Sequence, residues 1–189
     1  MAATDTLEQA FASTRKVLAN VNDDQLGDPT PCQTWDVREL VNHIIRGAHW
    51  FGESTEAGEG APQHETDYAA GDRLQAFDEG TKKAVAAFNA PGAQEKMVKL
   101  PFGEFPGAVF MGLATTDTFT HGWDLARATG QEAASLDPDL AKQLLVGAKA
   151  AIPDEFRGPD GQAPFGPVVD VPESAPPADQ LAGFLGRKV

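Results

Sequence analysis

Apolar residues recur every three or four positions in four long stretches of the chain, a pattern that predicts amphipathic helices. The predicted helices cover residues 5–21, 37–56, 67–88 and 106–130. Local signals support several of their ends. Asp36 is followed three residues later by Glu39, which resembles a capping box. The pair Pro91-Gly92 stops the third stretch, and Gly130 suits the position just past the end of the fourth.

The rest of the chain predicts shorter elements. Residues 94–105 alternate weakly around Pro-Phe-Gly, which indicates a short extended excursion or hairpin. Further helices are expected over 137–152 and 178–186. The stretch 157–178 is rich in Pro and Gly but carries four large apolar residues, so we expect it to pack on the helices. We therefore predict an all-α fold, a four-helix bundle with an extra C-terminal helical and loop segment, in one domain spanning 1–189.

Charge and hydropathy narrow the possible partners. The chain has 15 Lys+Arg against 28 Asp+Glu, a net charge of −13, so its surface repels phosphate backbones and predicts no nucleic-acid partner. No apolar run is long enough to span a membrane, and the first residues do not resemble a secretory signal. A cytoplasmic protein is the expectation. One cysteine, Cys32, excludes an internal disulfide and any CxxC motif. We interpret it as a small packed thiol, with a stabilised thiolate near a helix start as the alternative.

The fourth predicted helix carries charge on the stripe that its period directs toward the core. Counted in helical steps, that stripe contains Phe110, Leu113, Asp117, His121, Asp124 and Ala128. Asp117 and His121 are four residues apart, so their side chains meet on one helix face. A carboxylate and an imidazole at this spacing suit two ligands of one metal ion.

A third ligand is needed, and the four histidines of the chain offer one good candidate. His64 lies in a polar loop, and His49 is in register with charged residues and is expected to face solvent. His43 flanks the apolar stripe of the second helix and shares a face with Gly47 and Trp50. The absent side chain at position 47 leaves room beside it. His43, Asp117 and His121 would leave coordination positions open, as in a catalytic metal site.

Structural interpretations of the same residues remain open at this point. A lone Asp–His pair on a helix also fits a hydrogen bond, and His43 alone fits a core histidine. Asp124 fits an ion pair with Arg127 or Arg38 as well as support for a ligand. The tryptophans fit packing anchors. No residue stands out as a general acid or base.

Three blocks of sequence carry a resemblance to a known family. They are TPCQTWDVRELVNHIIRGAHWFG, THGWDLARATG and FGPVVDVPESAPPADQLAGFLGR. In this order they resemble an actinobacterial family of DinB-like proteins, which includes the N-terminal domain of mycothiol-dependent maleylpyruvate isomerase and the mycothiol S-transferases. The resemblance covers nearly the whole chain.

The resemblance implies a DinB-like four-helix bundle that holds a divalent metal near one end. The family's ligands are a His on the second helix and an acidic residue four before a His on the fourth, matching His43, Asp117 and His121. The acidic residue is often Glu in relatives, so Asp117 is one methylene shorter. The isomerases carry a further C-terminal domain that this chain is expected to lack, which argues against maleylpyruvate isomerase itself.

The expected function is therefore a metal-dependent and thiol-dependent S-transferase or isomerase that acts on small electrophiles. Zn²⁺ is the favoured metal, with Ni²⁺ as the second choice, and mycothiol or another low-molecular-weight thiol is the co-substrate. Asp124 would orient His121 from behind, and Gly47 and Trp50 would line the substrate pocket. The alternatives are a metal-dependent hydrolase with the same ligands and a non-catalytic bundle that binds a small ligand. A monomer or a homodimer is expected.

Overall fold

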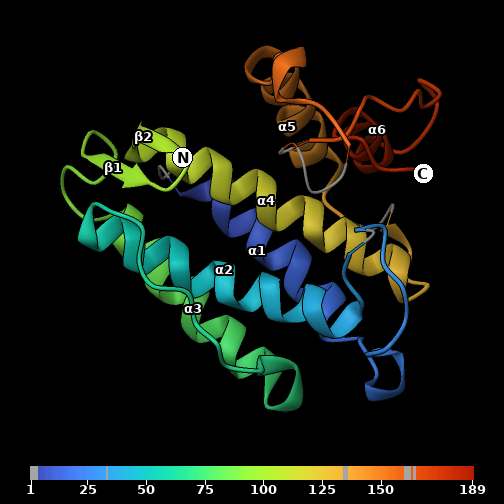
Figure 1. Cartoon of the computed structure of the whole chain (residues 1–189), viewed down its shortest axis with the longest axis horizontal. Coiled ribbons are helices and arrows are strands. Elements are labelled where there is room, and N and C mark those ends of the chain that lie inside the picture. Colours follow the sequence, from blue (N-terminus) through green and yellow to red (C-terminus); the bar gives the residue numbers. More distant parts are fainter. Residues whose placement is uncertain (1–3, 33, 134–135, 160–162, 164) are drawn as a thin grey trace.

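Four long helices form the body of the molecule and confirm the predicted bundle. The computed structural model describes residues 4–32, 34–133, 136–159, 163 and 165–189. The bundle helices are α1 (Asp5–Leu18), α2 (Val37–Ala57), α3 (Arg73–Phe88) and α4 (Gly107–Ala128). Figure 1 shows them side by side, with α2 next to α3 and α1 next to α4. The five largest fully buried side chains are aromatic: Trp123, Phe77, Phe88, Phe110 and Phe119.

Capping residues explain where two of these helices begin. At α2, Glu39 N–H donates to the Asp36 carboxylate, and the Glu39 carboxylate accepts from Asp36 N–H, so the capping box is confirmed. The third helix begins six residues later than predicted. A short 3₁₀ turn, Tyr68–Ala70, occupies the predicted start, and Asp72 then caps α3 by accepting from Gln75 N–H.

A β-hairpin connects α3 to α4, which confirms the expected extended excursion. Strand β1 (Met97–Leu100) pairs in antiparallel register with β2 (Gly103–Pro106). Within the described residues these strands form the two-stranded sheet of the molecule. The hairpin lies at the end of the bundle where α4 begins (Figure 1).

The C-terminal segment adds α5 (Pro138–Ala151) and α6 (Pro177–Phe184). Figure 1 shows both helices on the α4 side of the bundle, away from α2 and α3. Short 3₁₀ turns are also present at Asp23–Gln25 and Asp154–Phe156. The described part of the predicted tail, within residues 157–178, contacts α6, because Val169 N–H donates to the Gly183 carbonyl. Val168 beside it is 47% exposed. No helix among the described residues is long and apolar enough to cross a membrane.

Two positions differ from the sequence pattern. His49 was expected to face solvent, but it is only 5% exposed because α3 covers that face of α2, and its Nε2 lies 3.0 Å from the Ala76 carbonyl oxygen. That burial lowers the pKa of His49. Leu113 was expected on the inward stripe of α4, but it is 39% exposed. Phe110 on the predicted stripe is buried, and the buried face continues through Ala114 rather than Leu113.

Helices α2 and α3 approach closely at two glycines, Gly52 and Gly80. A Cβ at Gly52 would lie 2.9 Å from the backbone nitrogen of Ala84. This contact is too short, and relieving it requires the backbone of α3 to move. We expect Gly52→Ala to lower the free energy of unfolding by about 1–3 kcal/mol through overpacking. Urea unfolding measures this. Gly112→Ala, on the exposed face of α4, is the matched control, because nothing lies within 4 Å of the added methyl group there. It should be neutral or stabilising, and equal losses in both variants would contradict the packing argument.

Candidate metal centre

The side-by-side packing of α2 and α4 brings three predicted residues together. His43 Nε2 lies 3.6 Å from Asp117 Oδ2, and His121 Nε2 lies 3.5 Å from Asp117 Oδ1. The two imidazole rings are 4.6 Å apart between centroids. The two nitrogen–oxygen distances are too long for good hydrogen bonds. They are close to the roughly 3.4 Å between neighbouring ligand atoms that a tetrahedral ion with bonds of about 2.1 Å requires.

The donor set also fits a divalent ion in its chemistry and its exposure. His43 Nε2 is buried and has no hydrogen-bond partner within the part of the chain that the structure describes. An unpaired buried nitrogen is costly, and a bound cation would satisfy it. The side chains of His43 and Asp117 are each 36% exposed, whereas that of His121 is 12% exposed. The trio is therefore covered on the side of His121 and partly exposed on the side of His43 and Asp117.

The charges of the cluster are strongly coupled. Burial opposes the charge on Asp117, but His121 and His43 outweigh it and lower the pKa of Asp117 to about 2. Burial also opposes the charge on His121, but the carboxylates of Asp117 and Asp124 raise the pKa of His121 to about 10. At neutral pH Asp117 is thus ready to bind a cation. His121 carries a proton that a cation must displace.

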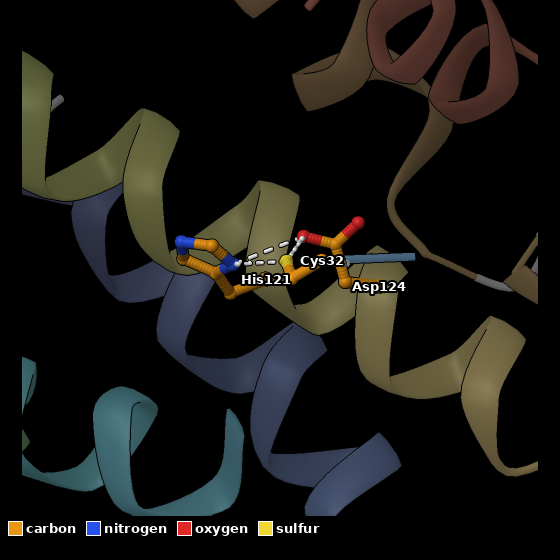
Figure 2. Close-up of side chains that lie close together, drawn as sticks. All are labelled: Cys32, His121 and Asp124. Atoms are coloured by element: carbon orange, nitrogen blue, oxygen red, sulfur yellow. Dashed lines mark hydrogen bonds and ion pairs between the residues drawn. The ribbon is translucent and has the colours of Figure 1, made fainter. Parts of the chain in front are cut away.

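Asp124 lies directly behind His121 and is fully buried. Figure 2 shows its carboxylate beside the imidazole ring, where His121 Nδ1–H donates to Oδ2 over 3.0 Å. This bond leaves His121 Nε2 facing Asp117. Arg187 is a second partner of Asp124, with Nε 3.2 Å from Oδ1 and Nη2 3.1 Å from Oδ2. Burial opposes ionisation of Asp124, but His121 and Arg187 keep its pKa below the usual value.

The ion pairs considered for Asp124 from the sequence are therefore wrong. Arg127 lies over the Trp123 ring, 5.5 Å from its centroid, and Arg38 binds Asp67 at 2.7 Å. Arg187 is a functional candidate that the sequence reasoning missed. The available signal was its place immediately after Gly186 at the end of the last apolar helix.

Cys32 approaches the same carboxylate. Its Sγ lies 3.4 Å from Asp124 Oδ2 and 3.9 Å from His121 Nδ1 (Figure 2). Cys32, His121 and Asp124 form a second group whose donor atoms could converge on an ion. Arg187 already occupies both oxygens of Asp124, so a cation there would compete with a guanidinium. The trio of His43, Asp117 and His121 is therefore the better metal site. The half-buried Cys32 donates its S–H to Asp124.

Two further residues, Trp35 and Gly47, border the trio, whereas Trp50, which was expected to line the pocket, does not. Trp35, a candidate that the sequence reasoning missed, places its ring 4.6 Å from His43 and 5.6 Å from His121. A Cβ at Gly47 would lie 3.9 Å from Asp117 Oδ2, so this glycine adjoins the trio as expected from its spacing. Trp50 donates its Nε1–H to the Ala61 carbonyl and packs on Phe110, so its described contacts lead away from the trio.

The fold and the cluster together define a class: a helical bundle with a His–Asp–His donor set between two of its helices. The family model of the mycothiol maleylpyruvate isomerase N-terminal domain matches residues 7–126, and the chain belongs to this family. The uncharacterized proteins MT0763 and Rv0738 of two Mycobacterium tuberculosis strains are each 43% identical over 182 residues. That alignment covers 96% of this chain and 94% of each relative.

Solved structures give the same fold. A crystal structure of the mycothiol-dependent maleylpyruvate isomerase matches with a TM-score of 0.55 at 13% identity, and a mutant of that enzyme with 0.58 at 14%. Each match covers 77% of this chain and 68% of the other. At such low identity the match shows the fold alone. It confirms the DinB-like all-α bundle.

Proposed function

We propose that this protein is a divalent-metal-dependent enzyme that uses a mycothiol-type thiol on a small electrophile, as an S-transferase or an isomerase. The observation that carries the proposal is the convergence of His43, Asp117 and His121 around a buried imidazole nitrogen that has no hydrogen-bond partner among the described residues. The family supports the thiol part, because its description names mycothiol. The net charge of −13 favours a small-molecule partner over nucleic acid.

Each residue of the centre has a definite role in this proposal. The Nε2 atoms of His43 and His121 and the carboxylate of Asp117 would hold the ion. Two imidazoles and one carboxylate suit Zn²⁺ best and Ni²⁺ next. Such an ion lowers the pKa of a thiol bound to it, so that the nucleophilic thiolate exists at neutral pH. The resemblance implies Glu at this position in many relatives, and the shorter Asp117 still lies within 3.6 Å of both histidines.

The surrounding residues would shape the reaction site. Asp124 holds the His121 ring so that Nε2 faces the ion. The Trp35 ring covers the two histidines on one side. Gly47 would border the site beside Asp117, and its missing side chain would ease the approach of the thiol.

Elemental analysis of untagged protein purified without chelator is the decisive test. About one equivalent of Zn²⁺ or Ni²⁺, native or after reconstitution, is the expected result, with loss of the ion in His43→Ala. Product formation from a panel of electrophiles should then require both the ion and mycothiol. A wild-type protein that takes up neither ion would overturn the proposal. Turnover that needs the ion but no thiol would support the hydrolase alternative instead.

A further inference from the structure

Arg187 connects the C-terminal segment to the back of the candidate metal centre. Its guanidinium donates to both oxygens of the fully buried Asp124, and the same carboxylate accepts from His121 Nδ1–H. A continuous line of contacts thus runs from Arg187 to the metal-facing Nε2 of His121. We propose that Arg187 is a positioning residue of the centre, so that the segment beyond the family match at residues 7–126 completes the site. This inference rests on the proposed function.

The end of α6 aims Arg187 at the bundle. Arg187 N–H donates to the Ala182 carbonyl at 2.9 Å, and Gly186 N–H donates to the Gly183 carbonyl at 3.0 Å. These two bonds form a Schellman motif, which needs a left-handed residue at the position before Arg187. Gly186 supplies it with φ +94°. A Cβ there would also lie 2.5 Å from the Cα of Gly166, so only glycine fits and the chain turns back toward α4.

Helix α6 itself is packed, so Arg187 does not belong to a free tail. Leu181, Ala182 and Leu185 are each 1% exposed. Trp123 Nε1–H, one residue from Asp124, donates to Asp179 of α6 at 2.7 Å. The Arg187 side chain is 18% exposed, and its Nη1 donates to the Leu185 carbonyl. The guanidinium is therefore held from both its own helix and α4.

The fork of an arginine explains why this position would matter to a metal. A bidentate guanidinium fixes the plane of a carboxylate as well as balancing its charge. With Arg187 in place, the carboxylate plane is fixed, and Asp124 Oδ2 accepts from His121 Nδ1–H in a set direction beside the S–H of Cys32. Without it, a buried carboxylate would lose two charge-assisted bonds and would have to rotate or admit water. Partners behind a metal-ligating histidine typically change metal affinity 10–100-fold.

The test compares Arg187→Gln and Arg187→Lys with the wild type. Zn²⁺ affinity, measured by competition with a chromogenic chelator, should fall about 10–100-fold in Arg187→Gln. Arg187→Lys keeps the charge but not the forked geometry of the guanidinium, so its Zn²⁺ affinity should lie between those of the wild type and Arg187→Gln. Circular dichroism should show the helical fold in each variant. Arg127→Gln is the matched control, because Arg127 sits at the same end of α4 but contacts the Trp123 ring and not Asp124. Its affinity should equal that of the wild type.

A double variant separates positioning from general destabilisation. If Arg187 acts through Asp124, Asp124→Asn and the double Asp124→Asn/Arg187→Gln should bind Zn²⁺ equally. Additive losses would overturn the inference, as would a folded Arg187→Gln that binds within twofold of the wild type. The Nδ1–H proton resonance of His121, followed by NMR in metal-free protein, should weaken or shift in Arg187→Gln. If the wild type bound no metal, the proposed function would fail while this resonance still decided the positioning role.

Discussion

Replacing His121 with alanine is expected to abolish metal binding. His121 is the residue at which the centre is joined: its Nε2 lies against Asp117, and its Nδ1–H donates to Asp124. Its loss removes one of three ligands and leaves two carboxylates without the imidazole between them. The affinity should therefore fall by more than the roughly 100-fold that loss of a supporting partner can cost. Thiol-dependent turnover should disappear with the ion.

Metal content and Zn²⁺ titration of the purified variant measure this effect, with circular dichroism to show that the bundle persists. His64→Ala is the matched control. His64 lies in the loop between α2 and α3 and contacts Glu53 and Tyr68 instead of the trio. It should keep one equivalent of metal. A His121→Ala protein that retained stoichiometric metal, or turned over thiol and electrophile without it, would contradict the assignment.

Much of this centre could be predicted because its signals are local or few. The i, i+4 spacing fixes Asp117 and His121 on one face of α4, whatever the rest of the chain does. His43 was reached by elimination among four histidines, aided by Gly47 one turn away. The helices themselves followed from a 3.6-residue period and from caps such as Asp36.

The remaining features depend on which element covers which face, and a single sequence does not state that. His49 has charged neighbours in register, yet α3 packs over it, with Gly80 leaving room for its ring. Leu113 follows the apolar period, yet no described element covers it fully. The pairing of Asp124 with Arg187 joins residues 63 positions apart. Arginines nearer in sequence were plausible partners, but the packing of α6 against α4 brings Arg187 to Asp124.

Metal affinity is expected to rise steeply with pH. In the metal-free protein the pKa of His121 is raised to about 10 by the two carboxylates beside it, although burial opposes this. Below that pKa an incoming ion must displace one proton, so apparent affinity should increase about tenfold per pH unit, or about 100-fold from pH 6.5 to 8.5. Asp117, with a pKa of about 2, stays ionised over this range and adds nothing. Titrations of Zn²⁺ against a chelator of known pH dependence measure the slope.

Stability without metal should change in the opposite direction. The folded-state pKa of His121 lies above its unfolded value of 6.5, so its contribution to stability is fully present below pH 6.5 and is lost as pH rises toward 10. The unfolding midpoint of metal-free protein should therefore fall across this window, while the additional stabilisation by Zn²⁺ grows. His121→Gln, which cannot titrate, should remove this part of the metal-free slope. An affinity independent of pH would mean that His121 already binds the ion as a neutral imidazole, and the coupling between its proton and the two carboxylates would be wrong.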